Sequence, residues 1–234
     1  MSEVLESRTG DVTADRGLVS PTFYPTISNR SSKMRVKRLL DISITILLIL
    51  FVWPLLLIVA VLVCLDGGSA IYGHTRVGYR GRSFQCLKFR SMRRDADRVL
   101  AEVLLRDPVA QREWEMFRKL PNDPRITRVG RFIRATSIDE LPQLLNVLRG
   151  DMSMVGPRPV VKEELTQHYG GAAMAYMSVR PGITGLWQVN GRSQTAYAER
   201  VALDLQYIRS LSLRADLAIL WRTIGVVLKC DGAY

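Results

Sequence analysis

The longest hydrophobic pattern along the chain is an uncharged apolar run from Ile42 to Leu65. As a straight helix rising about 1.5 Å per residue, the run would reach roughly 36 Å, which is enough to cross a hydrocarbon core of about 30 Å. The run is too long, and begins too far from the first residue, for the apolar part of a signal peptide. We therefore expect a membrane helix that stays in the mature protein.

Two features of this run bear on its topology. Pro54 lies at its middle, where a proline removes a backbone hydrogen bond and clashes with the preceding turn, so a kink is expected. The carbonyls freed there would need partners such as Ser43 or Thr45. A single transmembrane span is the simplest interpretation, but both flanks are basic and the positive-inside rule places both in the cytoplasm, which favours a re-entrant helix. The basic residues are Lys33, Arg35, Lys37 and Arg38 before the run, and Arg76, Arg80, Arg82, Lys88 and Arg90 after it.

Beyond the run, the pattern changes to short segments. Residues 69–77 and 83–89 flank the turn sequence Gly-Tyr-Arg-Gly at 78–81, which predicts a β-hairpin. Residues 95–106 and 109–119 are rich in helix formers and predict two helices broken at Asp107-Pro108. A short basic helix follows, which Gly130 is expected to interrupt.

Another helical pattern lies between Ser137 and Pro159. Leucines recur there with helical spacing, and Pro142 is tolerable only in a first turn, so the helix should begin near Ser137. Asp139 and Glu140 would then lie in that first turn, where the helix dipole favours a carboxylate and free N–H groups can hold a phosphate. Ser137-x-x-Glu140 is equally a capping-box pattern, which is the structural alternative.

The last helical pattern covers residues 213–228. Its apolar residues gather on one side, and its basic residues lie elsewhere. Such a helix lies either in a membrane interface or against the protein core, and Trp221 near basic residues favours the interface. The apolar residues are Leu217, Leu220, Trp221, Ile224 and Leu228.

Composition narrows the class of protein. Thirty-three Lys and Arg residues against 22 Asp and Glu give a formal net charge of +11, so anionic partners are expected. The three cysteines have no metal-ligand spacing, which supports neither a disulfide framework nor a zinc site. We predict a flexible tail over residues 1–32, a membrane helix over 33–66 and one catalytic domain over 67–234. The predicted fold class is α+β and mainly helical, with a short β-hairpin and interfacial amphipathic helices.

The arginines divide into two groups. Four of them recur at steps of three and are typical of a solvated or lipid-facing surface; these are Arg125, Arg128, Arg131 and Arg134. Arg158 instead stands between two prolines, in a rigid turn that aims its guanidinium at little entropic cost, and a guanidinium matches phosphate oxygens bidentately. Arg180, before Pro181-Gly182, follows the same logic.

Five stretches together resemble the bacterial sugar transferases, specifically the monotopic polyprenyl-phosphate phosphoglycosyl transferases of exopolysaccharide assembly. The likeness runs from about Lys37 to the C-terminus, and members that transfer galactose 1-phosphate are the most similar. The stretches are KRLLD at Lys37, LKFRSM at Leu87, DPRITRVGRFIR at Asp123, SIDELPQLLNVLRGDMSMVGPRP at Ser137 and VRPGITGLWQVNGR at Val179. The family often has Ser before the membrane proline, whereas Trp53 stands there in this chain.

The resemblance implies a two-step reaction. Asp139 would attack the phosphorus bonded to the sugar of a UDP-sugar, releasing UMP, and undecaprenyl phosphate would then take the phosphosugar. A carboxylate nucleophile of this kind divides one difficult transfer into two easier ones. Glu140 would hold Mg²⁺, a hard cation suited to a carboxylate and phosphate oxygens.

The resemblance also implies binding residues. Lys88, Arg134, Arg158, Arg180 and Arg192 are expected to hold phosphate or nucleotide. Asp204 would orient a basic residue or the nucleotide, or be structural. Trp187 is expected to be a buried anchor, with base stacking as the alternative. Neither histidine, His74 or His168, is assigned a catalytic role.

Several alternatives stay open from the sequence. A membrane-anchored scaffold could use the same basic surface only to recruit anionic lipid. Nucleic-acid binding is not expected, because no recognised module interleaves the basic residues with aromatics. A hydrolase using Asp139 and Glu140 as an acid/base pair is disfavoured, since adjacent residues on a helix diverge. The expected location is the bacterial inner membrane, with the catalytic domain on the cytoplasmic face. Membrane lipids are expected partners, and the sugar and a homo-oligomeric state are left open.

Overall fold

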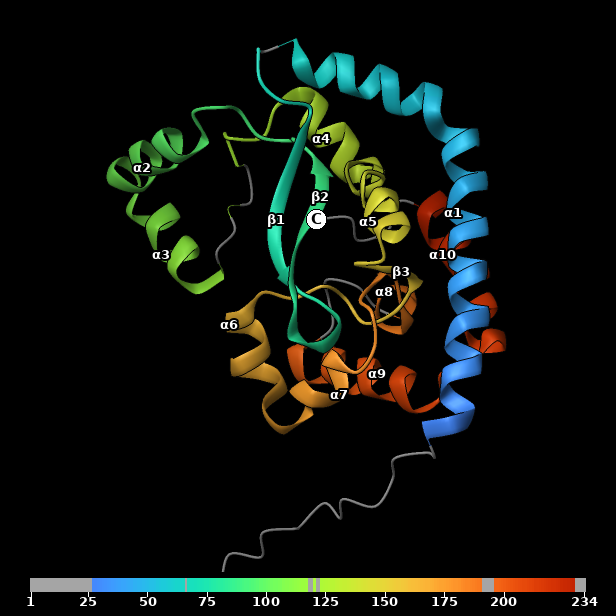
Figure 1. Ribbon diagram of the computed structural model, residues 1–234. Coiled ribbons are helices and arrows are strands. Elements are labelled where there is room, and N and C mark those ends of the chain that lie inside the picture. Colours follow the sequence, from blue (N-terminus) through green and yellow to red (C-terminus); the bar gives the residue numbers. More distant parts are fainter. Residues whose placement is uncertain (1–26, 66, 118–119, 121–122, 191–195, 230–234) are drawn as a thin grey trace, which may run out of the picture.

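The computed structural model describes residues 27–65, 67–117, 120, 123–190 and 196–229, and most of this part of the chain is helical. Short strands form two small sheets (Figure 1). The helices are α1 (Ile27–Cys64), α2 (Ala96–Arg106), α3 (Pro108–Phe117), α4 (Arg128–Ala135), α5 (Gln143–Arg149), α6 (Lys162–Glu164), α7 (Ala173–Met177), α8 (Leu186–Asn190), α9 (Tyr197–Arg209) and α10 (Leu213–Lys229). The strands are β1 (Ile71–Val77), β2 (Ser83–Phe89), β3 (Ser153–Val155) and β4 (Gly182–Thr184).

Helix α1 is long and bent. It has 38 residues with Pro54 inside, and begins at Ile27, six residues before the predicted membrane helix. Figure 1 shows a straight N-terminal part that turns sharply before the C-terminal part. Of the described residues, Met34–Cys64 is the one stretch long and apolar enough to cross a membrane, and only 11% of its most apolar window is buried.

Both arms of α1 are attached to the rest of the chain. In the N-terminal arm, the Lys37 ammonium binds Asp216 on α10 at 2.8 Å. In the C-terminal arm, Arg90 just after β2 donates to the Val63 carbonyl at 2.9 Å, and Val63 packs in one cluster with Phe89. The two ends of this apolar helix therefore return to the same folded body, and its exposed apolar side chains lie between them.

A buried charge cluster explains the N-terminal attachment. Lys37 is 6% exposed and lies between Asp216 and, at 3.7 Å, Asp41. Asp41 accepts from the Ser153 hydroxyl at 2.8 Å and from the Met154 backbone N–H at 3.2 Å. The sequence analysis counted Lys37 in the basic flank before the apolar run, and the structure shows that this cation is buried and paired inside the protein.

Other basic residues that flank the apolar run in sequence are also paired within the chain. Arg76 pairs with Glu164 at 3.7 Å, and Lys88 binds Glu140 at 2.6 Å. The sequence had suggested Thr45 as a partner for a carbonyl freed by Pro54. Its hydroxyl instead donates to the Asp41 carbonyl at 2.6 Å. The basic flanks are therefore a weaker guide to topology than their number indicates.

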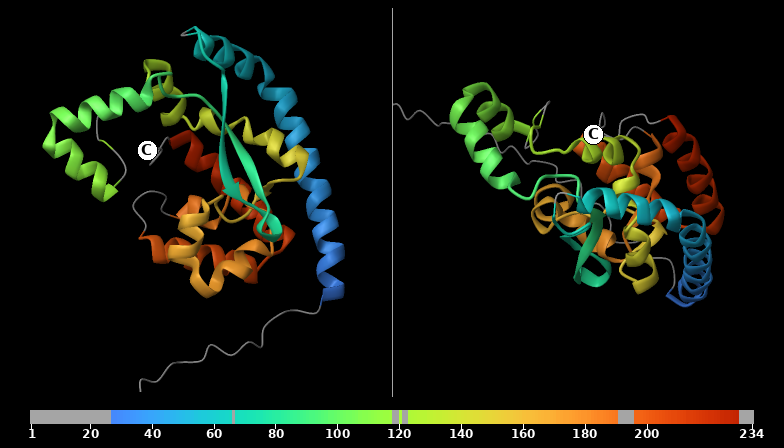
Figure 2. Two further views of the ribbon diagram at one scale, coloured as in Figure 1. Left: turned by 60° about the vertical axis from the view of Figure 1, so that its left-hand side comes forward. Right: turned by 90° about the horizontal axis from the view of Figure 1, so that it is seen from above.

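The predicted β-hairpin is confirmed. Strands β1 and β2 pair in antiparallel register, with Ile71 opposite Phe89 and Val77 opposite Ser83. The turn between them uses Arg80 at φ 58° and Gly81 at φ 75°, and the left-handed conformation is the reason for the glycine. Helices α2 and α3 follow within two residues of the predicted bounds, and Figure 2 shows them projecting from the body on the side away from α1.

A second sheet crosses the core, where β3 and β4 pair in parallel. Gly156 and Gly182 let the two backbones touch, since a Cβ on Gly182 would come within 2.1 Å of the Gly156 nitrogen. Residues from α5, β3, α9 and α10 pack around this sheet, and Val147 and Met152 are fully buried. Strand β3 is followed directly by the Gly-Pro-Arg-Pro turn at residues 156–159. Because β3 is buried in the core, the core sets the position of the Arg158 backbone.

The apolar residues predicted on α10 face outward. Leu217, Trp221 and Ile224 are exposed, Trp221 by 78%, whereas Ile219 faces the core at 4%. Leu220 is partly buried against the core, and the side chain of Leu228 lies outside the described residues. The helix thus presents an apolar stripe away from the protein, as the interfacial interpretation required.

Candidate active site

Asp139 and Glu140 lie in a 3₁₀ turn, η2 (Ile138–Glu140), between α4 and α5. Ser137 enters this turn at φ 57°, and α5 begins only at Gln143, after Pro142. The predicted helix start near Ser137 is therefore wrong by more than one turn. The physical reason is Pro142: in a helix that starts at Ser137 it would lie beyond the first turn, where it has no N–H for the Ile138 carbonyl, whereas next to the start at Gln143 the missing N–H costs no helical bond.

The capping-box alternative is also wrong. The Ser137 side chain makes no capping hydrogen bond in this turn. The Glu140 carboxylate instead accepts from the Lys88 ammonium at 2.6 Å, an interaction between residues 52 positions apart in sequence. The two adjacent carboxylates thus face strand β2 and are not used to close the helix end.

Asp139 is a buried carboxyl group among charges. It is 8% exposed, and its Oδ2 lies 3.7 Å from Lys88 Nζ. Burial raises its pKa above the ordinary value, Glu140 raises it further, and Lys88 and Arg134 lower it. A carboxylate held here is poorly hydrated but faces two cations, which suits a group that must stay anionic and yet react.

Arg134 lies in the last turn of α4, and its charge lowers the pKa of Asp139. Its Nε donates to the Ser91 hydroxyl at 2.8 Å, burial lowers its pKa, and Asp139 counteracts that effect. Helix α4 lies this close because Gly130 packs against the Ser91 carbonyl, where a Cβ would come within 1.9 Å. The sequence had suggested that Gly130 interrupts this helix, which is wrong, because α4 continues through it. Gly130 instead allows the helix to touch the KFRSM segment.

Asn146 is a residue whose role sequence reasoning missed. It is fully buried on α5, accepts from the Leu87 backbone N–H at 2.9 Å and donates to the Gln85 carbonyl at 2.8 Å. These two bonds attach α5 to the outer edge of β2, which sets η2 beside Lys88. A polar residue at a buried position of an otherwise leucine-rich helix was the sequence signal.

Arg158 lies over Trp187, with its guanidinium carbon 5.1 Å from the ring centroid. Trp187 is 3% exposed, so the expectation of a buried anchor is confirmed. Asp204, also buried, accepts from the Tyr169 hydroxyl at 2.7 Å. Burial raises the pKa of Asp204 to about 7, although the Tyr169 hydroxyl and the backbone N–H of Arg158 act to lower this pKa. Asp204 is thus bound to Tyr169 through Oδ2, and its buried Oδ1 has no hydrogen-bond partner among the described residues.

Cys86 and Lys88 are two residues apart on β2 and so point to the same face of the hairpin. Burial raises the pKa of the Cys86 thiol to about 11, while the charges of Lys88 and Arg158 lower it and that of Glu140 raises it.

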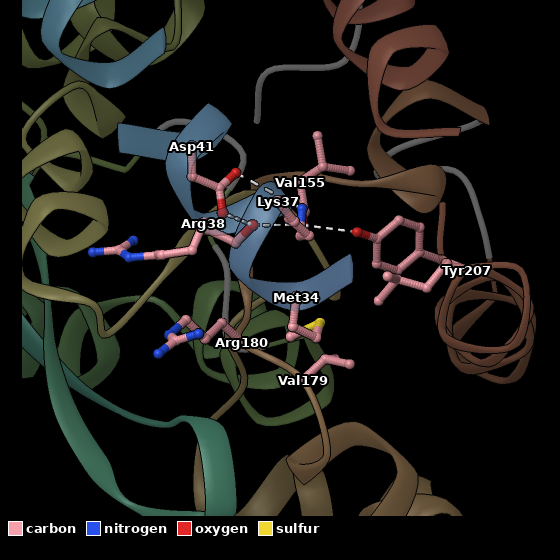
Figure 3. A pocket seen from close by; sticks show the side chains of 10 residues that line it. Met34, Lys37, Arg38, Asp41, Val155, Val179, Arg180 and Tyr207 are labelled. Atoms are coloured by element: carbon pink, nitrogen blue, oxygen red, sulfur yellow. Dashed lines mark hydrogen bonds and ion pairs between the residues drawn. The ribbon is translucent and has the colours of Figure 1, made fainter. Parts of the chain in front are cut away.

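The other predicted binding residues are placed differently. Arg180 donates from Nε to the Gly150 carbonyl at 2.7 Å and lies over Tyr79, at the far tip of the hairpin from Lys88. Figure 3 shows it beside Arg38 at a small pocket against α1. The structure does not bring Arg180 to Asp139, and Arg192 lies outside the described residues.

A metal ion has few protein ligands here. Within the described residues, no three His, Cys, Asp or Glu side chains gather as a metal site. Mg²⁺ is nevertheless commonly bound through one or two carboxylates, with substrate phosphates and water completing the shell. Glu140 fits that role, because its side chain is 36% exposed and a carboxylate has lone pairs beyond the one that accepts from Lys88.

The arrangement is a buried carboxylate flanked by cations, a second carboxylate able to hold a divalent ion, and arginines suited to phosphate, beside one long apolar helix. Such an arrangement is suited to an enzyme that acts on phosphorylated substrates. A sequence profile described as "Bacterial sugar transferase" matches residues 32–230, and the chain belongs to this family.

Several curated relatives carry more specific names. The chain is 53% identical over 208 residues to the "UDP-galactose-lipid carrier transferase" of Erwinia amylovora, which covers 89% of this chain and 43% of the relative. It is 51% identical to the "Undecaprenyl-phosphate galactose phosphotransferase" of Salmonella typhimurium, with the same coverage. It is 49% identical over 224 residues to the "Exopolysaccharide production protein ExoY" of Rhizobium meliloti, with 94% of this chain and 99% of that protein covered. The chain thus spans less than half of the first two relatives and nearly all of the third.

Proposed function

We propose that this protein transfers a hexose 1-phosphate from a UDP-sugar to undecaprenyl phosphate and releases UMP, as a first membrane step in exopolysaccharide assembly. The observation that carries the proposal is the buried Asp139 carboxylate, which lies 3.7 Å from the Lys88 ammonium and has its pKa lowered by the charges of Lys88 and Arg134. Names of relatives at about 50% identity favour galactose as the sugar. Glucose comes next, since a relative at 44% identity, from Caulobacter vibrioides, is named a "UDP-glucose:undecaprenyl-phosphate glucose-1-phosphate transferase".

In the first proposed step, an Asp139 carboxylate oxygen attacks the phosphorus that carries the sugar. A bond forms between that oxygen and phosphorus, the bond from phosphorus to the bridging oxygen breaks, and UMP leaves with the electron pair. Lys88 and Arg134 neutralise the charge on the phosphoryl oxygens, because both cations already face this carboxylate. The product is a covalent phosphosugar aspartate.

In the second step, a phosphate oxygen of undecaprenyl phosphate attacks the same phosphorus. The bond to Asp139 breaks, and the carboxylate is regenerated with its original charge, so no side chain gains or loses a proton over the cycle. The burial of Asp139 keeps water from competing with the lipid phosphate. Mg²⁺ held at Glu140 would neutralise negative charge on the donor diphosphate.

The proposed location follows from α1. We infer that α1 enters the bilayer and returns to the same side, with the catalytic domain on the cytoplasmic face. The support is that α1 is bent and has Pro54 inside it, and that both arms bind the same body, through Lys37 and Arg90. The exposed stripe of α10, with Trp221 at its centre, would rest in the membrane interface of the inner membrane.

The reaction is tested by incubating purified protein with undecaprenyl phosphate, Mg²⁺ and a panel of UDP-sugars while UMP release is recorded. Release that requires both the lipid phosphate and one sugar nucleotide is the expected result. Binding of lipid and nucleotide without UMP release from any donor would instead favour the membrane-anchored scaffold.

The topology is tested by cysteine labelling in a background without the native cysteines. Single cysteines at positions 30 and 80 should both react with a membrane-impermeant reagent only when the cytoplasmic face is accessible. Position 80 lies in the hairpin turn and position 30 before the apolar stretch. Labelling of the two positions from opposite sides would show a single span and reject the re-entrant arrangement.

A further inference from the structure

Arg38 and Arg180 form a pair of cations at a small pocket against the N-terminal arm of α1 (Figure 3). Arg38 donates from Nη2 to the Leu148 carbonyl at 3.1 Å, and Arg180 donates from Nε to the Gly150 carbonyl at 2.7 Å. The two carbonyls lie two residues apart at the carboxyl end of α5, so both guanidiniums are held over the same short piece of backbone. Figure 3 shows both groups projecting from the pocket on the side away from Tyr207.

Both guanidiniums have N–H donors that the described part of the chain does not use. Arg38 Nη1 is shielded from solvent and has no hydrogen-bond partner among the described residues. Arg180 also lies over the Tyr79 ring, with its guanidinium carbon 5.4 Å from the centroid, and this contact orients the group without using a donor. A guanidinium carries five N–H donors, and within the described residues each of the two gives one of them to a backbone carbonyl.

The charges of this pair are not neutralised by a carboxylate in contact. Burial lowers the pKa of Arg38 and the charge of Arg180 lowers it further, while Asp41 and Asp151 raise it from a distance. Among the described residues, neither arginine forms an ion pair with a carboxylate. Two like charges held together repel each other, and an anion bound between them removes that cost.

The surroundings of the pair are apolar and exposed. Arg38 lies four residues before Ile42, where the uncharged run begins, and the side chain of its neighbour Leu39 is 66% exposed. The side chain of Leu148, whose carbonyl Arg38 binds, is 37% exposed on α5. A phosphate joined to acyl chains fits this combination better than a free phosphate, because only the lipid can cover the apolar side chains beside the two arginines.

We propose that Arg38 and Arg180 form a binding site for the phosphate of a membrane phospholipid, separate from the candidate active site. Guanidinium forks bind phosphate oxygens bidentately, which suits a headgroup phosphate placed between them. The two sites are separate because Arg180 lies against Tyr79 at the far tip of the hairpin from Lys88. The inference rests on the membrane location given under the proposed function and does not depend on the transfer reaction.

The test measures binding of phosphatidylglycerol to the full-length protein in detergent, by native mass spectrometry and by the rise in the thermal unfolding midpoint. Wild type should bind phosphatidylglycerol, whereas diacylglycerol with the same acyl chains and inorganic phosphate alone should each stabilise it much less at equal concentration. Arg38→Met and Arg180→Met should each raise the Kd for phosphatidylglycerol by about tenfold or more, the loss of charge-assisted hydrogen bonds. Arg38→Lys should lie between, because lysine keeps the charge but lacks the fork.

Two further variants serve as controls. Arg35→Met removes an exposed arginine from the same arm of α1, and Lys88→Met removes the cation of the candidate active site. Both should bind phosphatidylglycerol like wild type. Unfolding of every variant without lipid is measured first, and if Arg38→Met does not fold, Arg180→Met decides, because Arg180 lies outside α1.

Weaker lipid binding in Arg180→Met, with both controls like wild type, supports the site. Equal affinity in Arg180→Met and wild type, or a loss confined to Lys88→Met, would overturn it. If inorganic phosphate protects wild type as strongly as phosphatidylglycerol does, the ligand is a soluble phosphate and the lipid assignment is rejected. None of these measurements uses UMP release, so failure of the proposed reaction and failure of this inference are distinguishable.

Discussion

Two regions of this chain combine one lysine with two carboxylates and differ in the exposure and the hydrogen bonding of these groups. In the cluster at α1, Lys37 joins Asp41 and Asp216, and the lysine and aspartate side chains are 7 to 9% exposed. At the candidate site, Lys88 joins Asp139 and Glu140, and the Lys88 and Glu140 side chains are 33% and 36% exposed. Composition alone therefore does not separate a structural charge cluster from a reactive one.

The difference lies in the neutral donors. Asp41 accepts from a hydroxyl and a backbone N–H, and Asp216 accepts from the Tyr207 hydroxyl at 2.8 Å, so their lone pairs are occupied. Asp139 is balanced chiefly by the charges of Lys88 and Arg134. A carboxylate compensated by charge rather than by short hydrogen bonds keeps an oxygen free to attack phosphorus. Substitution of single residues in each region tests this difference.

The largest effect is expected at Asp139. Asp139→Asn should lower turnover by about four orders of magnitude or more, as removal of a nucleophile does. Wild-type protein given UDP-sugar without lipid and quenched in acid should gain one hexose-phosphate mass on the peptide containing Asp139, and the variant should gain none. Membrane association should persist in the variant, because α1 is untouched. An unmodified wild-type protein that nevertheless turns over would show direct transfer and leave Asp139 as a base or a metal ligand.

Glu140→Gln should have the next largest effect. We expect activity to fall roughly 10²- to 10³-fold, the scale for losing one electrostatic contribution to a transition state. Titration with Mg²⁺ should show a higher concentration needed for half-maximal activity. If the variant keeps both near-normal activity and the same metal requirement, Glu140 is not the ligand.

The two lysines should respond in opposite ways. Lys37→Met leaves Asp41 and Asp216 without their cation and should destabilise the protein by about 3–5 kcal/mol, the cost of breaking a buried pair. Lys88→Met should cost much less stability, because its partners are more exposed, and should instead lower activity. Thermal unfolding in detergent measures both, with Arg35→Met as the surface control. Equal losses of stability would remove the distinction between the two regions.

The smallest expected effect is a pH dependence of stability at Asp139. Because burial raises the pKa of this carboxyl in the folded protein above the unfolded value of 3.8, the folded state holds the proton more tightly. Stability that is present below pH 3.8 is therefore lost as the pH rises towards the folded pKa. Wild type should become less stable relative to Asp139→Asn across this window, as followed by denaturant unfolding. A constant difference between the two proteins would contradict the raised pKa.

Local patterns predicted much of this fold. The hairpin, α2 and α3 depend on turn residues and helix formers close in sequence, and they were found close to where those residues indicate. The turn at Asp139 was not predicted, because leucine spacing cannot distinguish a helix that starts at Ser137 from a 3₁₀ turn followed by a helix that starts at Gln143. Elements whose limits depend on one proline are set by packing as well as by sequence.

The site was predictable in its residue types and less so in its partners. Of the residues that the resemblance singled out, the structure brings Lys88 to Asp139 and Glu140. The resemblance could not reveal that Lys37 is paired 179 positions away. Nor did it distinguish Arg180, which binds a backbone carbonyl elsewhere. Which cation meets which anion is decided by tertiary distance, and that information is absent from charge spacing.

Asn146 has a consequence for how this protein behaves among its own copies. The hairpin is only two strands wide, so the outer side of β2 would present free N–H and C=O groups that invite another strand. The Asn146 side-chain amide imitates a peptide unit and occupies that edge at Gln85 and Leu87. The residue that positions the catalytic turn therefore also protects the hairpin against edge-to-edge aggregation.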